Sequence, residues 1–365
     1  MSLQALVLVG GEGTRLRPLT LTRAKPALTL VDRPFVQFMV EWLGRHGVDE
    51  AILACGFGAE DLRSALGDSV PGGPAIRYLE EPESLGTAGP IRLAADLGLL
   101  GERFLVVNGD LLTDLDLSAH VAAHQERDAV ASLALYPVDD PSSYGLVRRG
   151  DDGEVHGFLE KPDPAEIDTD EVNAGAYVLE RAVVDLIPPG RAVSIEREIF
   201  PRLVGQGLYG LRLEGYWMDI GTPERYLQAS WDILTGAVET EASARVDGAG
   251  LGVDEHAEVD GAATLEPPVF VESGAHVAAA ALGPRVVIGE QCEVGDGARI
   301  SGSVLHARCR VGAEAVVEDS ILGVGAEVGA GAEVRHGSVI GEGARVEPGA
   351  VVEHDARLEP GGVAA

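Results

Sequence analysis

A glycine-rich basic segment near the N-terminus carries the first residues that could do chemistry. The apolar run 5–9 leads into the sequence GGEGTR at 10–15, and Arg17, Arg23 and Lys25 follow. Glycines let backbone N–H groups approach a phosphate, and basic side chains neutralise its charge. The segment therefore predicts an anion site. It lacks both the Lys-Ser or Lys-Thr of a P-loop and the final glycine of a dinucleotide-binding G-x-G-x-x-G motif.

Lysine is nearly absent from the rest of the chain. Only two of the 28 basic residues are lysines, Lys25 in RAKPA and Lys161 in LEKPD. Arginine offers a planar fork, whereas lysine offers a compact and flexible point charge. We interpret the two lysines as phosphate-binding residues, with chance survival under a codon bias as the alternative.

Two aspartates follow apolar segments that read as strands. Asp110 ends VVNGD, and Asp219 lies in GYWMDIGTP between Trp217 and Ile220. Ligands of open α/β sheets bind at the carboxyl ends of strands, and carboxylate oxygens are ligands for Mg²⁺. A carboxylate among apolar neighbours is costly unless it is paired or bound to a metal. The two aspartates could hold one divalent ion, although a turn aspartate is the simpler interpretation of Asp110.

Three further motifs combine polar groups with turns. GFLEKPDP places Glu160 and Lys161 at a strand end, and VNAGAYVL places Asn173 at a strand start. An acid, an amine and an amide suit the hydroxyls and phosphate of a sugar phosphate. ESLGTAGP contains a glycine turn at 86–89 that opens a helix, and its backbone could read the edge of a base.

The elements that must position these residues follow two different sequence patterns, one in each part of the chain. Residues 1–235 alternate strand and helix patterns, which indicates an α/β domain with a largely parallel sheet. The expected strands are Ala5–Val9, Ala51–Cys55, Phe104–Val107, Val130–Tyr136 and Ala174–Leu179, and the expected helices are Pro34–His46, Ala59–Leu66, Thr87–Leu97 and Leu117–Glu126.

A six-residue repeat follows a linker at 236–250. Nineteen aliphatic positions from Val253 to Leu358 recur every six residues, with three five-residue steps, among Gly, Ala and Glu. This period predicts a parallel β-helix over 251–365, in which three hexads make one coil, so about six coils are expected.

Composition narrows the classes of protein. The net charge of −31 and a pI near 4.5 disfavour binding to nucleic acid or to an anionic membrane surface. No apolar run approaches the ~20 residues of a membrane span, and no signal peptide is recognisable. Three cysteines without a C-x-x-C motif read as buried hydrophobic residues. We expect a cytoplasmic protein.

The motifs together resemble a known family. GGEGTRLRPLT with KP, LGTAGP, NGD, EKP, VNAG and WMDIGTPERY occur in this order, and the chain is similar to the sugar-1-phosphate nucleotidyltransferases. Within them it most resembles the mannose-1-phosphate guanylyltransferases, whose C-terminal hexads it shares. The run EEPESLGTAGP is slightly longer than is usual there, at the place where the base should be read.

The resemblance implies a reaction, a fold and a set of roles. A nucleoside triphosphate, most simply GTP, and a sugar 1-phosphate, most simply mannose 1-phosphate, would give a nucleotide-sugar and pyrophosphate. The fold would be a Rossmann-like, mostly parallel sheet followed by a left-handed β-helix of hexapeptide repeats. The implied roles are catalysis by Arg15, Lys25, Asp110, Lys161 and Asp219, nucleotide binding by Leu8, Gly10, Gly11, Gly13, Thr14, Gly86 and Thr87, sugar-phosphate binding by Gly145, Glu160, Lys161 and Asn173, and Mg²⁺ binding by Asp110 and Asp219.

Several alternatives stay open. The chain could be a glucose-1-phosphate uridylyl- or thymidylyltransferase, or a non-catalytic subunit that senses nucleotide-sugars. The β-helix could carry acyl transfer, although its five histidines occupy different hexad phases. We expect the β-helix to support a homo-oligomer, so that its removal changes assembly or stability more than chemistry.

Overall fold

The computed structural model describes residues 3–56, 58–160 and 162–365, which form two compact units. The first unit holds the chain up to Gly11 and then Val36–Trp217, and the second holds Glu12–Phe35 and Met218–Ala365. The basic segment therefore belongs to the same unit as the C-terminal repeats, and not to the unit that contains the sheet.

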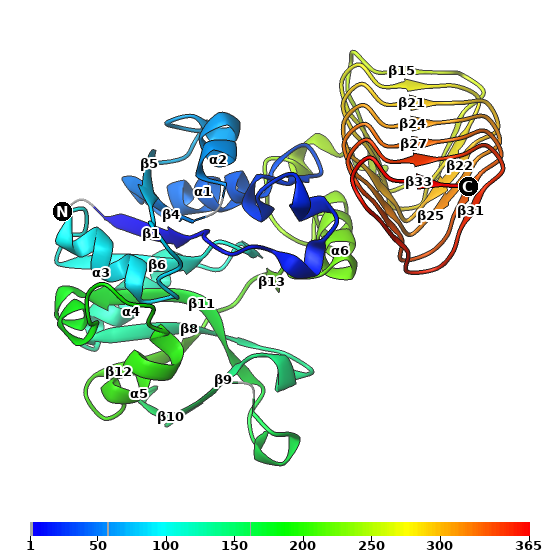
Figure 1. Cartoon of the computed structure of the whole chain (residues 1–365). Coiled ribbons are helices and arrows are strands. Elements are labelled where there is room, and N and C mark those ends of the chain that lie inside the picture. The colour runs from blue at the N-terminus through cyan, green and yellow to red at the C-terminus, as the bar shows by residue number, and fades with distance from the viewer. Residues whose placement is uncertain (1–2, 57, 161) are drawn as a thin grey trace. The chain divides into compact units, whose positions relative to one another are not determined.

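A mixed sheet forms the centre of the first unit (Figure 1). Within the described residues it has nine strands, in the order β10-β9-β11-β6-β1-β4-β5, with β8 on β11 and β12 on β8. β6, β1, β4 and β5 are parallel, whereas β11 runs antiparallel to β6. The strands are β1 (Gln4–Leu8), β4 (Glu50–Cys55), β5 (Ala75–Glu80), β6 (Arg103–Asn108), β8 (Ala131–Pro137), β9 (Gly145–Arg149), β10 (Val155–Glu160), β11 (Glu171–Glu180) and β12 (Leu208–Arg212), with the short β7 (Leu111–Thr113) after β6.

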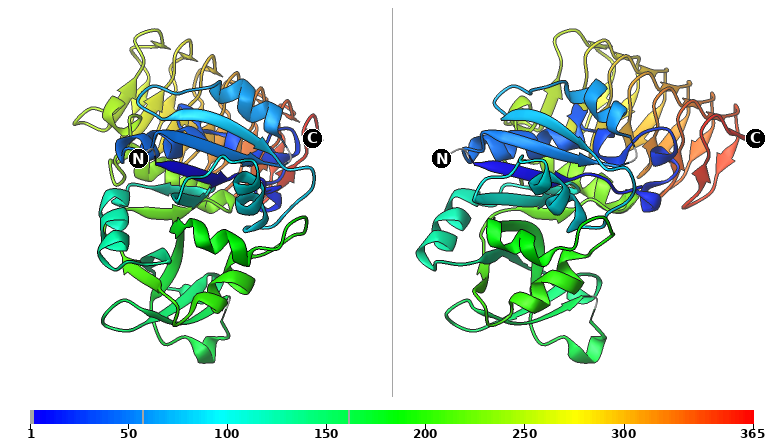
Figure 2. Two further views of the ribbon diagram at one scale, coloured as in Figure 1. Left: turned by 90° about the vertical axis from the view of Figure 1, so that its left-hand side faces the viewer. Right: turned by 60° about the vertical axis from the view of Figure 1, so that its left-hand side comes forward.

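Helices flank this sheet (Figure 2). The apolar stripe expected along the first helix is confirmed, because Phe35, Phe38, Met39, Trp42 and Leu43 are all at most 4% exposed. The helices of the unit are α1 (Phe35–Arg45), α2 (Ala59–Leu66), α3 (Gly89–Asp96), α4 (Leu117–Glu126) and α5 (Phe200–Leu203). Each of the four predicted helices is present, with ends shifted by at most two residues.

The second unit begins with the basic segment. There the chain makes three short 3₁₀ turns, η1 (Thr14–Leu16), η2 (Leu19–Leu21) and η3 (Lys25–Ala27), and then a small hairpin of β2 (Thr29–Leu30) and β3 (Arg33–Pro34). After β13 (Trp217–Asp219), α6 (Pro223–Leu234) leads to the repeats.

The repeats form the predicted left-handed parallel β-helix. In the described part of the chain its strands make three parallel sheets of seven, seven and six strands, which stack as coils in Figure 1. All nineteen predicted aliphatic positions lie in strands. The strands are β14 (Leu251–Val253), β15 (Glu258–Val259), β16 (Thr264–Leu265), β17 (Val269–Val271), β18 (His276–Val277), β19 (Ala281–Leu282), β20 (Val286–Ile288), β21 (Glu293–Val294), β22 (Arg299–Ser301), β23 (Val304–Leu305), β24 (Arg310–Val311), β25 (Val316–Glu318), β26 (Ile321–Leu322), β27 (Glu327–Val328), β28 (Glu333–Val334), β29 (Val339–Ile340), β30 (Arg345–Val346), β31 (Val351–Val352), β32 (Arg357–Leu358) and β33 (Val363–Ala364).

Burial within the stack follows the position of each coil. Val271 in the second coil and Val317 in the middle of the β-helix are fully buried, whereas Val253 in the first coil is 43% exposed. A coil at the end of the stack is covered on one side only, so its inward residues keep part of their surface in water. The three cysteines are free and buried, as predicted. Among the described residues, no helix combines the length and the apolar character that crossing a membrane requires.

Candidate active site

In the first unit, the candidate residues gather at the carboxyl edge of the parallel strands. Leu8, the last residue of β1, pairs with Asn108 at the end of β6, and the amide of Gly109 donates to the carbonyl of Leu8 at 2.9 Å. Gly10 and Gly11 follow β1, and the half-buried Asp110 follows β6. The expectation that Asp110 lies at this edge is thereby met, beside the start of the glycine-rich segment.

The glycines at this edge have different physical reasons to be glycine. A Cβ on Gly109 would lie 2.6 Å from the carbonyl oxygen of Leu8 and 2.5 Å from Cγ1 of Val9, so the two strand ends could not approach as they do. A Cβ on Gly11 would meet nothing within 4 Å. Packing explains Gly109, and it leaves Gly11 available for the close approach of a ligand.

The VNAG motif lies against the NGD motif. β11 pairs with β6 on one side and with β8 on the other, and its register with β8 shifts between Asn173 and Tyr177. The Asn173 side chain holds this bulge, since its Nδ2 donates to the Tyr177 hydroxyl at 2.8 Å and its Oδ1 accepts from the amide of Gly175 at 3.0 Å. A Cβ on Gly175 would lie 2.6 Å from Nδ2 of Asn108. Asn173 thus shapes the edge of the sheet around Asn108, a contribution that the sequence did not reveal.

The predicted sugar-phosphate residues Gly145 and Glu160 are also brought together. They face each other in the antiparallel register of β9 and β10. Lys161 lies outside the described residues. An aromatic cluster that the sequence did not indicate adjoins this region: the Trp217 ring lies 5.4 Å from Tyr144 and 5.5 Å from Tyr136.

The LGTAG turn is held by hydrogen bonds to a segment that is distant in the sequence. The Thr87 hydroxyl donates to Glu196 at 2.7 Å and accepts from the amide of Ile195 at 2.9 Å, while the amide of Ala88 donates to the carbonyl of Val193 at 2.9 Å. A Cβ on Gly86 would lie 2.5 Å from that same carbonyl. The Thr87 side chain therefore fixes the turn, and the turn is held in shape by SIER at 194–197.

Glu81 is a second residue that sequence reasoning missed. Its Oε2 accepts from the amide of Leu85 at 3.2 Å, and its Oε1 lies 3.0 Å from where a Cβ of Gly10 would be. Partial burial raises the pKa of the Glu81 carboxyl, an effect that the hydrogen bond from Leu85 opposes. Glu81 belongs to the sequence EEPES at 80–84. Its carboxyl group therefore places this run next to Gly10, the first glycine of the glycine-rich segment.

In the second unit, the basic segment folds back on itself around Lys25. Gly13 has φ of +62°, and a Cβ there would lie 2.9 Å from Cβ of Lys25 and 3.0 Å from Cγ2 of Thr20. The Thr20 hydroxyl donates to the carbonyl of Gly13 at 2.9 Å. Lys25 is 8% exposed, whereas Thr14 and Arg15 are exposed. The glycine thus permits the turn that places Lys25 against the loop.

The same unit brings Arg15 to the turn that follows Asp219. A Cβ on Gly221 would lie 2.6 Å from Nη2 of Arg15, so the guanidinium packs closely against this glycine. Asp219 is half-buried, and its Oδ2 lies 3.4 Å from Nη1 of Arg225. The Thr222 side chain caps α6 by accepting from the amide of Arg225. Three of the five predicted catalytic residues therefore share one structural unit.

The donor chemistry of the two aspartates fits a hard divalent cation. Mg²⁺ takes oxygen ligands, keeps several waters and typically uses one or two carboxylates with substrate phosphates. Within the described residues no group of three or more His, Cys, Asp or Glu side chains is arranged to hold a metal by itself. Any ion at Asp110 or Asp219 would then need further oxygens from water and from the substrate.

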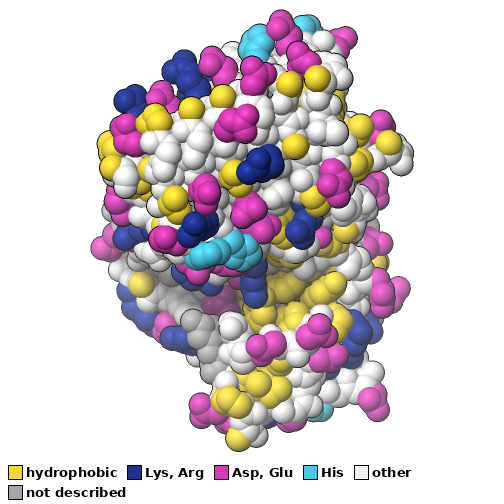
Figure 3. All heavy atoms as spheres, turned by 90° about the vertical axis from the view of Figure 1, so that its right-hand side faces the viewer, with side chains coloured by type: hydrophobic (Ala, Val, Ile, Leu, Met, Phe, Trp, Pro, Cys, Tyr) yellow, Lys and Arg dark blue, Asp and Glu magenta, His cyan; other side chains and the backbone are white. Residues whose placement is uncertain are grey.

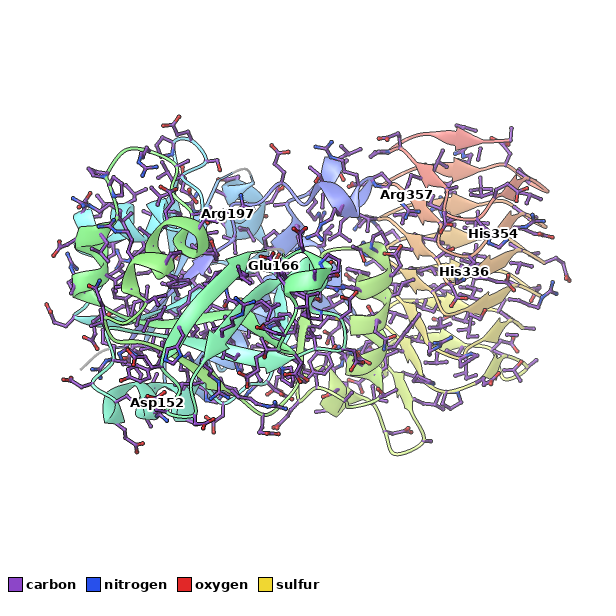
Figure 4. The ribbon with its side chains drawn as sticks, turned by 90° about the horizontal axis from the view of Figure 1, so that it is seen from below. Asp152, Glu166, Arg197, His336, His354 and Arg357 are labelled. Carbon is purple, nitrogen blue, oxygen red and sulfur yellow. The ribbon has the colours of Figure 1, made fainter. Side chains whose placement is uncertain are left out.

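The histidines of the β-helix do not form a common site. His276 faces Glu258 at 3.0 Å, and His306 is buried at 4% exposure. His336 and His354, labelled in Figure 4, come from neighbouring coils and their rings lie 6.2 Å apart. The structure thus gives no clustered donors for acyl transfer among these residues.

Comparisons with known proteins show which families the chain is similar to. The family model described as nucleotidyl transferase matches residues 4–236, and the model of the GMPPB C-terminal domain matches 253–359. A Mycobacterium tuberculosis protein named mannose-1-phosphate guanylyltransferase is 39% identical over 241 residues, which are 65% of this chain and 66% of that protein. An Arabidopsis thaliana protein named probable mannose-1-phosphate guanylyltransferase 2 is 37% identical over 294 residues, 76% of this chain and 80% of that protein.

Solved structures agree with the fold of the N-terminal part. The crystal structure of HddC from Yersinia pseudotuberculosis superposes with a TM-score of 0.55 at 28% identity, over 62% of this chain and 98% of that one. The match to the mycobacterial relative spans just under two thirds of that protein's length. Since the first family model covers residues 4–236, more than half of the sequence, the chain belongs to the nucleotidyl transferase family.

Proposed function

We propose that the protein joins GTP to mannose 1-phosphate to give GDP-mannose and pyrophosphate. The observation that carries this proposal is the double match, in which both the nucleotidyl transferase model and the GMPPB C-terminal model align in order along one chain. Relatives named mannose-1-phosphate guanylyltransferase from a bacterium and a plant supply the base and the sugar of the proposal.

In this reaction a phosphate oxygen of mannose 1-phosphate attacks the α-phosphorus of GTP. The bond between the α-phosphorus and the bridging oxygen breaks, and pyrophosphate leaves. Such a transfer depends on alignment and on neutralising phosphate charge more than on acid–base chemistry. Gly10, Gly11 and Gly13 would admit the triphosphate to the backbone.

The charged residues would share the neutralisation. Arg15 and Lys25, held in one unit, would serve the triphosphate, and Lys161 the sugar phosphate. Mg²⁺ at Asp110 and Asp219 would supply positive charge on the phosphates when bound. Leu8, Thr14, Gly86 and Thr87 would form the nucleotide pocket, and Gly145, Glu160 and Asn173 would contact the sugar.

The test is a matrix of nucleoside triphosphates against sugar 1-phosphates, with pyrophosphate release as the readout, with and without Mg²⁺. We expect the GTP and mannose 1-phosphate pair to give the highest kcat/KM. Asp219→Asn should lower turnover by at least about a hundredfold with an unchanged melting temperature, because a neutral amide holds a divalent cation far less well. Asp232→Asn, on the same helix as Arg225, is the matched control.

The same matrix separates the alternatives. A preference for UTP or dTTP with glucose 1-phosphate would replace the proposed substrates. Tight nucleotide-sugar binding without turnover of any pair would mark a sensing subunit. We further propose a cytoplasmic homo-oligomer assembled through the β-helix, for which light scattering of the full chain is the test.

A further inference from the structure

We propose that His306, a residue of the β-helix, is a positioning residue for the segment that carries Lys25. It acts through the hydroxyl of Tyr226 on the backbone carbonyl of Thr29. The inference rests on the proposed function in one respect, namely that Lys25 serves the triphosphate.

A buried hydrogen-bonded chain links the three residues. The Tyr226 hydroxyl donates to the carbonyl of Thr29, and its oxygen lies 2.9 Å from Nε2 of His306. Tyr226 is 1% exposed and His306 is 4% exposed. A phenol has one proton, and here Thr29 receives it, so Nε2 of His306 must be the donor to Tyr226. Burial, and then the charge of Arg23, lowers the pKa of His306 to about 4, so the ring is neutral at pH 7.

A short stretch of hydrogen-bonded backbone connects Thr29 to Lys25. η3 ends at Ala27, the amide of Leu28 donates to the carbonyl of Lys25 at 3.1 Å, and the amide of Phe35 donates to the carbonyl of Leu28 at 2.8 Å. Thr29 itself lies in the β2–β3 hairpin. A shift of the Thr29 carbonyl therefore moves the turn that presents Lys25.

Packing reinforces the link. Residues of the basic segment and of the β-helix line one small pocket of about 10 Å³, which is about the room of a single water molecule. Arg23 and Thr29 line it from the basic segment, and His306, Gly323 and Glu342 line it from the β-helix.

A second tether holds the other end of the same segment. Arg245 donates to Asp32 at 2.8 Å, to Glu272 at 2.9 Å and to Asp254 at 3.3 Å. The Asp32 side chain is only 2% exposed, so its charge is desolvated and its pairing with arginine matters. The first coils of the β-helix thus hold the hairpin through Arg245 at Asp32, while His306 acts on the Thr29 carbonyl at the start of the hairpin.

Tyr226 also connects His306 to the other candidate residue of this unit. It lies in the first turns of α6, the helix that starts directly after the Asp219 turn and whose Arg225 contacts Asp219. One buried tyrosine therefore couples the Lys25 segment and the Asp219 turn to the β-helix. The repeats would then serve the chemistry itself, beyond the assembly role that the sequence led us to expect.

The experiment compares four variants of the full chain. His306→Leu removes the donor at similar volume, His306→Gln keeps an N–H at a similar reach, and Tyr226→Phe removes the hydroxyl. His354→Leu is the matched control, because His354 is an exposed histidine of the same β-helix (Figure 4). Hydrogen–deuterium exchange of peptides covering residues 19–33 is measured without ligand, and KM is measured for each substrate.

We expect His306→Leu and Tyr226→Phe to speed exchange in residues 19–33 about tenfold and to raise KM for the triphosphate about five- to tenfold. KM for the sugar 1-phosphate should stay within twofold, and His306→Gln should restore both quantities toward those of the unchanged chain. Exchange in His306→Leu equal to that in His354→Leu would overturn the inference. Faster exchange with an unchanged triphosphate KM would overturn it too, by leaving His306 a structural role alone.

Failure of the proposed function gives a different pattern. If the unchanged chain turns over no substrate pair, the proposed reaction is wrong. The exchange measurement still decides whether His306 holds the segment, since it needs no ligand, and binding of a triphosphate measured by calorimetry then takes the place of KM.

Discussion

At the scale of single residues, two buried histidines stand out because both are held neutral. Burial, and then the neighbouring His124, lowers the pKa of His120 to about 3, and its Nε2 lies 3.0 Å from the Ser132 hydroxyl. The pKa of His306 is lowered to about 4, chiefly by burial. In an unfolded chain both would titrate near 6.5. Below pH 6.5 these two histidines therefore bind protons when the chain unfolds, which favours the unfolded state.

This difference sets a direction for stability against pH. The contribution of His306 is fully present above pH 6.5, falls as the pH drops from 6.5 toward about 4, and changes no further below that value. As the pH falls from 6 to 5, each such histidine lowers the free energy of unfolding by roughly 1 kcal/mol, a little below the limit of about 1.4 kcal/mol per pH unit for one full proton. Thermal melting over pH 5–7 should show a shallower pH dependence in His306→Gln than in His354→Gln. Equal slopes would contradict the assignment of His306 as a buried neutral group.

The position of a residue could be predicted where a single segment of the sequence determines it. Asp110 was placed correctly because a strand followed by Asn-Gly-Asp defines a carboxyl edge by itself. Glu81, Glu196 and His306 could not be found this way, because their partners Leu85, Thr87 and Tyr226 are fixed only by the folded chain. His306 looks in the sequence like any other polar corner residue of a hexad.

At the scale of elements, the glycines of the strand ends give a paired prediction. Gly109→Ala should lower the free energy of unfolding by a few kcal/mol, because its Cβ would lie 2.6 Å from the Leu8 carbonyl and the parallel strands would have to separate. Gly11→Ala has open space and should leave melting unchanged or slightly raised. If its backbone meets the triphosphate, Gly11→Ala should raise the triphosphate KM about tenfold. A stable Gly109→Ala would remove the packing argument.

Elements were the most predictable level of this chain. All nineteen positions predicted from the six-residue repeat lie in strands. A six-residue period fixes which residue of each hexad points into the core of a β-helix with three flat sheets. The α1 stripe was equally direct, since helical spacing fixes its buried face. The bulge at Asn173 was not predictable, because it is held by hydrogen bonds of the Asn173 side chain to the Tyr177 hydroxyl and from the Gly175 amide, and no local sequence pattern indicates them.

At the scale of the whole molecule, the acidic residues that give the net charge of −31 are spread along the whole sequence. Figure 3 shows acidic side chains scattered among basic and apolar ones across one face. On one sheet of the β-helix, charges of opposite sign meet between coils, as in Arg310 with Glu327 at 3.3 Å and Arg345 with Glu327 at 3.0 Å. Such exposed pairs add little stability each, but they keep like charges from stacking.

Truncation of the chain at two points in the β-helix tests which coils the activity depends on. A chain ended after residue 354 loses β32 and β33 but keeps His306, Gly323 and Glu342, so the triphosphate KM should stay within about twofold. A chain ended after residue 318 loses the latter two contacts and should raise that KM at least about tenfold. Melting curves of both chains control for fraying of the new terminal coil. Equal KM values would show that the distal contacts do not matter.

The coiled stack also has an evolutionary consequence. Each coil contacts only its neighbours, and the contacts to the basic segment involve coils up to Glu342. Gain or loss of a whole coil beyond that residue would leave His306 and the residues that line this pocket in place, whereas the same event between Asp254 and His306 would displace His306 from Tyr226. Natural selection should therefore tolerate variation in the number of coils at the C-terminal end and resist it nearer the catalytic sequence.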